Sequence, residues 1–278
     1  MRNSPHFMGS DVTELPLYLN DIDSNDVKTR LLAPFAPRYR VLRQLRAEPP
    51  ELRLPYRDLV MTSDRKFLFL RNAKAGCTSI AQILYYYGTG SFYPRSIHRA
   101  QSGVLLSRYH WSKVKPVLEA GRAFLFTFVR DPEARAYSAF TNFFVDQKNI
   151  ARHNHMPALQ ALGYSADNPV SRNFDIYLDY LEACLDADPV RTSTHFRPQV
   201  LNIAYGALSY DFIGKLENIA EDLPKVFELG GAPGFPPTDV MNARFNPSMA
   251  QRPPELTDGQ RRRIRTIFAA DYAAFGYD

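Results

Sequence analysis

Cysteine and long apolar runs are the scarcest features of this 278-residue sequence. Only Cys77 and Cys184 occur, which makes a disulfide framework implausible and favours a reducing compartment. No stretch approaches the roughly 18 uninterrupted apolar residues that indicate a transmembrane helix. Residues 1–19 lack a basic region followed by an apolar run, so they do not resemble a signal peptide or a membrane anchor. These absences predict a cytoplasmic protein with no integral membrane contact.

Acidic residues are outnumbered by basic ones, 29 against 34, which gives a formal net charge of +5 at pH 7. This modest excess fits an anionic ligand such as a nucleotide, and it also fits an ordinary basic protein. Zinc-finger spacings, RNA-binding aromatic signatures and clusters of metal-ligand side chains are absent. We therefore expect no nucleic-acid partner and no metal site. We interpret the one basic cluster, Arg261 to Arg265, as a solvated helix face.

Pro, Asp and Arg are frequent in residues 1–60, where hydrophobic periodicity is weak. We expect an irregular, partly extended N-terminal arm with helical turns near 26–32 and 36–46, broken by the Pro49-Pro50 pair. Residues 61–278 form the second predicted unit, in which short apolar runs suited to buried strands alternate with helical segments. The predicted strands are 66–70, 123–129 and 210–213, and the predicted helices are 80–87, 111–120, 132–145, 174–185, 221–229 and 257–270.

This alternation predicts an α/β fold, with a P-loop-like parallel sheet flanked by helices. Ligands of such sheets bind at the loops that follow the carboxyl ends of the strands. Residues 146–171 are polar and turn-rich, which predicts a surface loop, and the Pro-rich segment 232–254 is expected to be irregular. Thr257-Asp-Gly-Gln260 has the pattern of a capping box that opens the last helix.

Small residues and hydrogen-bond donors follow the first predicted strand, in Arg71-Asn-Ala-Lys-Ala-Gly-Cys-Thr-Ser79. Backbone N–H groups and the positive end of the next helix make such a loop a natural anion site. Gly76 permits close approach of the backbone, and Lys74 offers a mobile ammonium group. The Walker A pattern G-x-x-x-x-G-K-[ST] is absent, which disfavours a magnesium-dependent nucleoside triphosphate site. Taken alone, the loop fits a routinely capped helix N-terminus equally well.

A more specific segment follows the second predicted strand: Phe126-Thr-Phe-Val-Arg-Asp-Pro-Glu-Ala-Arg-Ala-Tyr-Ser-Ala-Phe140. Arg130 stands at the strand end, and Asp131 with Pro132 predicts the start of a helix that carries Ser138 two turns later. An arginine fork plus a hydroxyl group suits a phosphate. Two anion sites on two strand-end loops imply a ligand with phosphate groups at both ends.

These segments resemble the PAPS-dependent sulfotransferases, which take a sulfuryl group from 3′-phosphoadenosine-5′-phosphosulfate (PAPS). Phe128 to Ser138 reproduces the family's pattern F-V-R-D-P-x-x-R-x-x-S, and Arg71 to Ser79 resembles its 5′-phosphosulfate loop. His195-Phe-Arg-Pro-Gln199, followed by residues 210–222, is similar to carbohydrate sulfotransferases of the chondroitin and HNK-1 type. The resemblance covers roughly residues 66–228.

The resemblance implies PAPS as the donor and PAP as its product, without a metal. The first loop would hold the 5′ end of PAPS, and Arg130 and Ser138 would hold its 3′-phosphate. The implied acceptor is a hydroxyl group, or an amine, of a carbohydrate, a glycolipid or a small metabolite. The alternative location is the Golgi lumen, for a member without its anchor. The predicted donor-binding residues are Arg71, Asn72, Ala73, Lys74, Ala75, Gly76, Cys77, Thr78, Ser79, Arg130 and Ser138.

Sulfuryl transfer needs stabilisation of the leaving oxygen and a base for the acceptor hydroxyl. Lys74 is the candidate for the first task. Histidine is the usual base near neutral pH, and His98 lies between the two donor segments, the interval from which related carbohydrate enzymes take their base. His110 is the second candidate, and His195 could instead orient the third segment. A structural role for His98 is equally open.

Two other functions stay open from the sequence. A P-loop-like kinase acting on a small hydroxyl substrate would need magnesium ligands, and a non-catalytic PAP-binding protein would keep the donor site without turnover. We interpret Glu217 and Asp222 as charge partners or helix caps. The acceptor and the oligomeric state are not fixed by these patterns, because acceptor sites are built from variable loops.

Overall fold

A five-stranded sheet forms the centre of the protein, in the strand order β3-β1-β2-β4-β5. The structure, a computed structural model, describes residues 15–21, 27–100, 102–243 and 256–278. The strands are β1 (Leu59–Thr62), β2 (Phe67–Leu70), β3 (Val104–Leu106), β4 (Phe124–Val129) and β5 (Phe212–Lys215).

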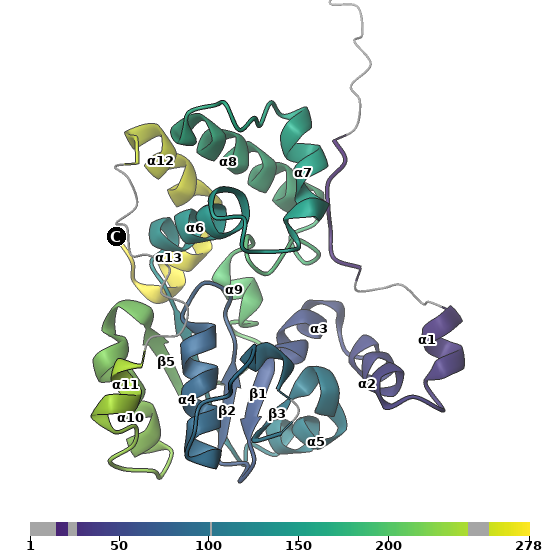
Figure 1. The fold of residues 1–278 in the computed structure, drawn as a ribbon, viewed down its shortest axis with the longest axis vertical. Helices are drawn as coiled ribbons and strands as arrows, with labels where there is room; N and C mark the ends of the chain where they lie inside the picture. The colour runs from purple at the N-terminus through teal and green to yellow at the C-terminus, as the bar shows by residue number, and fades with distance from the viewer. Residues whose placement is uncertain (1–14, 22–26, 101, 244–255) are drawn as a thin grey trace, which may run out of the picture.

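Helices cover both faces of the sheet, and a further group of helices lies beyond the carboxyl end of β4, where α6 begins (Figure 1). The helices are α1 (Val27–Leu32), α2 (Pro37–Arg46), α3 (Pro50–Arg57), α4 (Cys77–Thr89), α5 (Ser107–Glu119), α6 (Pro132–Phe140), α7 (Arg152–Ala161), α8 (Val170–Ala187), α9 (Gln199–Asn202), α10 (Ile219–Leu229), α11 (Thr238–Asn242), α12 (Asp258–Ile267) and α13 (Ala269–Phe275). The short helical turns are η1 (Ile97–Arg99), the π-helical η2 (Thr141–Val145) and η3 (Leu216–Asn218).

The direction of the strands confirms the α/β class and adds one feature to it. Strands β2, β4 and β5 run parallel, and Phe69 pairs with Phe126 in their register. Strand β1 runs antiparallel to both of its neighbours, β2 and β3, so the sheet is mixed. Neither β1 nor β3 was among the strands predicted from the sequence.

The side chains of β2 and β4 alternate between two hydrophobic clusters. Phe69 and Phe126 lie in the cluster that α4 and α10 cover, and their rings stack with centroids 5.1 Å apart. Leu68 and Leu125 lie in the opposite cluster, with residues of α2 and α5. Because both faces are covered, all four residues of β2 are buried, which explains its uninterrupted apolar sequence.

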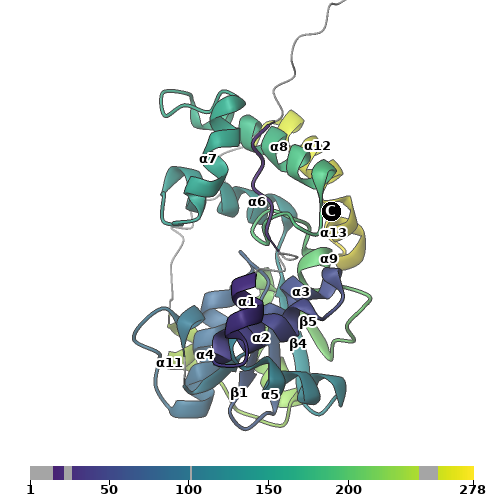
Figure 2. The ribbon, with the colours of Figure 1, turned by 90° about the vertical axis from the view of Figure 1, so that its right-hand side faces the viewer.

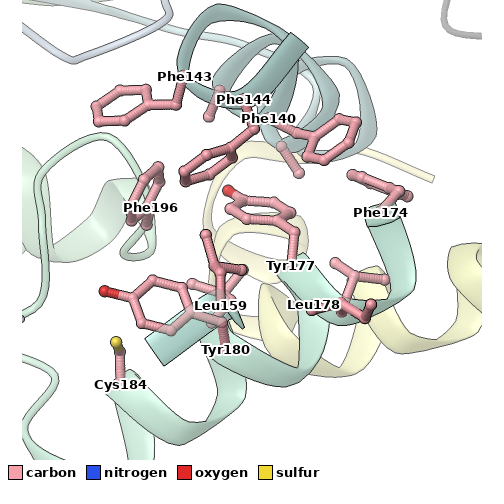
Figure 3. Packing of buried hydrophobic residues seen from close by; sticks show 14 of the residues in the cluster. Phe140, Phe143, Phe144, Leu159, Phe174, Tyr177, Leu178, Tyr180, Cys184 and Phe196 are labelled. Atoms are coloured by element: carbon pink, nitrogen blue, oxygen red, sulfur yellow. The ribbon is translucent and has the colours of Figure 1, made fainter. Parts of the chain in front are cut away.

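An aromatic cluster holds the helices beyond the sheet together, with contributions from α6, α8 and the segment before α9 (Figure 3). The rings of Phe140 and Phe174 meet edge to face, with centroids 5.2 Å apart. Tyr177 and Phe196 pack beside them and are fully buried.

The prediction of a surface loop over 146–171 is wrong in its middle, because residues 152–161 form α7. His155, Ala158 and Leu159 are buried on one side of this helix. The ring nitrogen Nδ1 of His155 lies 2.6 Å from the hydroxyl oxygen of Tyr180 on α8. Packing against α8 therefore stabilises a helix that the local composition does not favour.

The N-terminal segment is more helical and better packed than an extended arm. Helices α1 and α2 occupy the two segments where helical turns were expected, although residue 26 lies outside the described residues. Helix α3 begins at Pro50, inside the pair that was expected to break the arm, because proline is well tolerated at the first helical position. Val41 and Leu45 of α2 are buried in the cluster that includes α5.

The C-terminal part contains the expected capping box and a segment that is less irregular than expected. Thr257 and Gln260 form the expected capping box: the Thr257 hydroxyl accepts from the Gln260 N–H, and the Gln260 side chain accepts from the Thr257 N–H. The segment expected to be irregular contains α11, and its residues 244–254 lie outside the described residues. Within the described part of the chain, no helix combines the length and apolar character needed to cross a membrane.

Candidate active site

The first loop joins β2 to α4 and is shaped by two residues in the left-handed region. Gly76 has φ +74°, and a Cβ atom at this position would lie 2.7 Å from Cδ1 of Leu216. The left-handed backbone conformation therefore favours glycine, and a Cβ atom would also require the Leu216 side chain to shift. Lys74 has φ +68°, which is uncommon for a residue with a side chain and costs about 1–3 kcal/mol. The loop thus holds a strained conformation directly before the N-terminus of a 13-residue helix.

Lys74 is a half-buried cation that forms no ion pair with the described residues. Burial lowers the pKa of its ammonium group to about 8, and the charges of Arg130 and Arg135 act in the same direction. Cys77 and Asp146 oppose this shift. Within the described ranges, the Lys74 ammonium has no hydrogen bond and no ion pair. A cation held in this way favours an anion from outside the chain.

Arg130 supplies a second cation at the end of β4. Its Nη1 donates to the backbone oxygen of Lys74 at 3.3 Å, which joins the second loop to the first. This is the one side-chain hydrogen bond of Arg130 to the described residues, so most of its N–H donors stay available. Burial lowers the pKa of Arg130, and Glu217 is the carboxylate that opposes this shift most strongly.

The helix that follows Arg130 begins as expected. Asp131 is the N-cap of α6 and accepts a hydrogen bond of 2.7 Å from the backbone of Ala134, and Pro132 is the first helical residue. Ser138 is half-buried on this helix, one turn beyond Arg135. Its hydroxyl makes no hydrogen bond with the described residues, so it can donate to a ligand.

Arg135 fixes the position of the first loop relative to the second and third segments. Its guanidinium is 1% exposed and donates three hydrogen bonds of 3.0 Å each, to the backbone oxygens of Ala73, Thr194 and Arg197. No carboxylate pairs with it directly among the described residues. Its buried charge therefore depends on these carbonyl groups, and displacing any of the three segments would leave N–H donors unsatisfied.

Gln199 makes a second connection between the same loops. Its Oε1 accepts from the Asn72 side chain and from the Arg130 backbone N–H, each at 2.9 Å, and its Nε2 donates to the Arg130 backbone oxygen at 2.8 Å. Asp271 of α13 accepts from the Gln199 backbone N–H at 2.8 Å. We call Arg135, Gln199 and Asn72 the loop bracket, because these buried side chains hold both donor loops at a fixed separation.

His98 belongs to a chain of four polar side chains, in which Arg71 and Thr78 are its two neighbours. Asp58 accepts from Arg71 Nη2 at 2.5 Å and also pairs with Arg108. Arg71 Nη1 lies 2.5 Å from His98 Nδ1, and His98 Nε2 lies 3.0 Å from the hydroxyl oxygen of Thr78. Because arginine can only donate, Nδ1 of His98 accepts, and its Nε2–H donates to Thr78.

The charges around His98 keep its imidazole neutral. Burial lowers its pKa to about 4, and the positive charges of Arg71 and Arg108 add to this shift. Burial alone would raise the pKa of Asp58, but the same two arginines hold it well below its ordinary value. His98 therefore lies beside the first loop, with both ring nitrogens already engaged.

The other two histidine candidates lie in different surroundings. His110 is in α5, and its pKa is lowered by burial and by Lys113; no hydrogen bond links it to either donor loop in the described chain. His195 lies close enough to Lys74 for the ammonium charge to contribute to its pKa. Burial, followed by that charge, lowers the pKa of His195 to about 3. Its imidazole makes no hydrogen bond with any described residue and packs edge to face on Phe143.

A cavity of about 520 Å³ lies between α6, η2, α7 and the start of α8. Its lining combines the aromatic rings of Phe144 and Tyr164 with the amides of Gln147 and Gln160, and none of the donor-loop residues belongs to it. Asp146, whose charge acts on Lys74, lies between two lining residues in the sequence. The segment that follows α6 therefore contributes both to the lining of the cavity and to the electrostatic surroundings of Lys74.

The profile of the sulfotransferase family matches residues 57–278, which is most of the chain. The chain belongs to the sulfotransferase family. The match begins at the last residue of α3 and includes the sheet and both donor loops. No solved structure gives a significant match.

The chain is similar to several proteins named carbohydrate sulfotransferases. Carbohydrate sulfotransferase 14 of Danio rerio is 28% identical over 183 residues, which cover 63% of this chain and 48% of that protein. Carbohydrate sulfotransferase 12 of Xenopus laevis is 28% identical over 167 residues, covering 55% and 39%. Carbohydrate sulfotransferase 9 of Homo sapiens is 26% identical over 230 residues, covering 76% and 51%. The chain thus spans about half the length of these relatives, or less. These matches confirm the resemblance that the motifs indicated.

Hydrogen bonds link the first loop to Arg130 directly and through side chains whose role the sequence did not indicate. Arg135 and Gln199 lie within two of the sequence motifs, but the sequence alone did not indicate a role for either residue. Asp58 and Asp271 carried no signal, because their partners are distant in the sequence. Glu217 accepts from the Asp131 N–H and the Tyr277 hydroxyl, as a cap or charge partner would.

Proposed function

We propose that this protein transfers a sulfuryl group from PAPS to a hydroxyl group of a carbohydrate acceptor. The observation that carries this proposal is the pair Lys74 and Arg130, two half-buried cations on adjacent parallel strand ends without a carboxylate partner among the described residues. Membership of the sulfotransferase family supports the reaction class, and the names of the similar proteins support the acceptor class.

The donor loops fit the two ends of PAPS. The 5′-phosphosulfate would be held by Lys74, by the backbone of Ala75 and Gly76, and by Thr78 and Ser79 at the start of α4. Arg130 and Ser138 would hold the 3′-phosphate, since a guanidinium fork and a hydroxyl both donate to phosphate oxygens. When bound, PAPS supplies an activated sulfuryl group with a phosphate as its leaving group. Cys77 packs on the apolar cluster below the loop, and we give it no chemical role.

The first three loop residues are better suited to positioning than to direct contact through their side chains. Arg71 is committed to Asp58 and His98, and the Asn72 amide is fully buried against Gln199, Asn202 and the Phe128 carbonyl. The Ala73 carbonyl accepts from Arg135. We therefore propose that these residues keep the backbone of the loop in place while the residues after them meet the donor.

We propose that Lys74 stabilises the charge that develops on the leaving oxygen. Its low pKa reflects burial first and the charges of Arg130 and Arg135 next, and Asp146 opposes them only in part, so an arriving anion would be favoured and would raise that pKa again. A fixed cation of this kind requires no rearrangement during the reaction, which is how electrostatic stabilisation accelerates group transfer.

We assign the base to His195 and a positioning role to His98. His98 would have to lose its bond to Arg71, or its Nε2 proton, before it could accept a proton from a substrate. His195 is neutral and has no partner in the described chain, so a lone pair is available. A bound anionic donor beside Lys74 would raise its pKa towards the range that suits proton transfer.

The cavity beside Asp146 supports a carbohydrate acceptor. Amide groups such as those of Gln147 and Gln160 both donate to and accept from sugar hydroxyls, and the rings of Phe144 and Tyr164 offer apolar faces to the sugar ring. A single cation in the lining, Arg152, would favour a saccharide that carries a carboxylate or a sulfate group.

The deciding experiment is a transfer assay with radiolabelled PAPS on a panel of neutral and acidic oligosaccharides, glycolipids and small hydroxyl metabolites. We expect label on at least one saccharide, with activity retained in EDTA and lost in Lys74→Ala. EDTA-sensitive transfer from ATP, with none from PAPS, would establish a kinase instead. Tight PAP binding by calorimetry without transfer to any acceptor would establish a binding protein. The predicted cytoplasmic location is tested separately by fractionation of cells that express the tagged protein.

A further inference from the structure

Helix α1 exposes two apolar side chains, Val27 and Leu31, and buries the polar side chain of Thr29. Val27 and Leu31 are 66% and 65% exposed, and Phe35 in the turn that follows is 84% exposed. On the opposite side of the helix, Thr29 is buried, and Ala33 one turn later is buried as well. Residues four apart share one helix face, so Val27 and Leu31 form an outward apolar stripe that Phe35 extends.

This orientation is fixed by contacts with α2, which lies beneath α1. The Thr29 hydroxyl accepts a hydrogen bond of 3.1 Å from Nη1 of Arg46. Helix α2 in turn buries Val41 and Leu45 in the core cluster that includes α5. The stripe therefore cannot turn inwards without breaking the packing of α1 on α2. An exposed apolar stripe on a helix that is held in place by its neighbour is typical of an interaction surface.

The same segment carries one sign of charge. Residues 27–47 contain six basic residues and no acidic one, whereas the whole chain has 34 basic and 29 acidic residues. Five of the six are exposed and the sixth is half-buried. Arg38 and Arg43 make no ion pair with the described residues. The six basic residues are Lys28, Arg30, Arg38, Arg40, Arg43 and Arg46.

The α1–α2 surface lies far from the donor loops. Figure 1 shows α1 at the outer edge of the molecule, beyond α2, while α4 and the first loop stand on the other side of the sheet. Figure 2, turned by 90°, shows α1 and α2 together in front of the sheet and away from α6 and α7. A partner on this surface would therefore leave the donor site open.

We propose that the α1–α2 surface docks the protein on a membrane that carries anionic lipids. Val27, Leu31 and Phe35 would enter the boundary between headgroups and acyl chains, and the basic side chains around them would bind lipid phosphate and carboxylate groups. The apolar stripe distinguishes a membrane from an acidic polysaccharide, which would use the cations and leave the stripe exposed. A second copy of the chain is disfavoured, since two surfaces of the same positive sign repel each other.

The test is sedimentation of the full chain with vesicles of phosphatidylcholine alone and of phosphatidylcholine mixed with phosphatidylserine. We expect binding to the mixed vesicles only, weakened by salt at about 0.5 M, where screening is nearly complete. Leu31→Ser with Phe35→Ser should reduce the bound fraction about tenfold or more, and Arg38→Gln with Arg43→Gln should reduce it several-fold. Ile150→Ser is the matched control, because Ile150 is 82% exposed on a different part of the surface.

Three results would overturn the proposal. The first is equal binding to both kinds of vesicle, and the second is unchanged binding of the Leu31→Ser, Phe35→Ser variant. The third is a change from dimer to monomer in that variant by light scattering, which would identify the surface as a contact between copies. Circular dichroism and PAP affinity should be unchanged in every variant, which excludes unfolding as the cause.

Discussion

His98 and His195 both lie near the first loop, and their surroundings differ in the respect on which their proposed roles rest. The region of His98 is saturated: Asp58, Arg71, the imidazole and Thr78 form a continuous chain in which both ring nitrogens have partners. The region of His195 is unsaturated, because neither its imidazole nor the Lys74 ammonium has a partner among the described residues. A saturated group positions its neighbours, and an unsaturated group in a buried site is available to a ligand.

The largest effect is expected at His195. His195→Ala should lower kcat about 10²–10⁴-fold while PAP affinity stays unchanged, because the proton acceptor is lost and the donor contacts remain. Since burial and Lys74 lower the pKa of His195 in the free enzyme, its base form persists as pH falls, and the acidic limb of the kcat/KM profile should lie below the value of about 6.5 for free imidazole. That limb should be absent in the variant.

The matched control for this experiment is His153→Ala, which removes an exposed histidine from α7 and should leave kcat unchanged. Retention of full activity and of the acidic limb in His195→Ala would show that the base lies elsewhere and would end the contrast between the two histidines.

The second-largest effect is expected at Lys74, where a neutral side chain should lower the activity and raise the stability of the protein. Lys74→Met should lower kcat about 10²–10³-fold. The lowered pKa of Lys74 means that the unfolded chain binds its proton more tightly, so at pH 7 the native state is penalised by this charge and the penalty fades between about pH 8 and 10.5. The variant should therefore melt about 2–4 °C higher at pH 7, with a smaller gain above pH 8. A lower melting temperature of the variant at pH 7 would contradict the inference that the buried charge of Lys74 destabilises the native state.

Arg130 tests whether the second loop binds the donor rather than assisting the chemistry. Arg130→Ala should weaken PAP binding about 30- to 1,000-fold, since a charge-assisted contact is removed, with little change in kcat at saturating PAPS. Arg130→Lys should recover part of the affinity, because the charge remains but the fork is lost. Unchanged PAP affinity by calorimetry would remove Arg130 from the donor site.

His98 should give a smaller effect of a different kind. His98→Ala should lower kcat about tenfold, because Thr78 loses the donor that orients its hydroxyl, and the acidic limb should stay. His98→Gln should restore most of the activity, since a glutamine amide can donate to Thr78. If His98→Ala abolishes both activity and the acidic limb, His98 is the base and the saturated chain opens during turnover.

The smallest effect is expected at His110. His110→Ala should change kcat and PAP affinity less than about twofold, because its pKa responds only to burial and Lys113 and no bond joins it to the donor loops. A loss comparable with that of His195→Ala would require α5 to reach the site in the complex with substrate.

The sequence predicted the parts of the molecule that depend on neighbours in the chain. The β2 and β4 runs, the Asp131–Pro132 helix start and the Thr257 capping box are local patterns, and they are present in the structure. Helix α7 could not be predicted, because its stability comes from burying His155 and Leu159 against α8. The saturation of His98 was equally hidden, since Asp58 and Arg71 are 40 and 27 positions away from it and only the paired strands β1 and β2 bring them together.

The loop bracket also bears on how the protein would select its nucleotide in a cell that contains abundant ATP. Because Arg135 and Gln199 hold the backbone of the two loops in place, we expect the cations of Lys74 and Arg130 to fit a ligand that carries an anion at each end. ATP has no 3′-phosphate, so binding it would bury Arg130 without an anion. A site that strands a polar group in this way rejects the incomplete ligand by several orders of magnitude, about 10⁴-fold where such discrimination has been built into enzymes. Selectivity for the donor would thus come from the rigidity of the bracket, and a competition assay with PAP against ATP would report it directly.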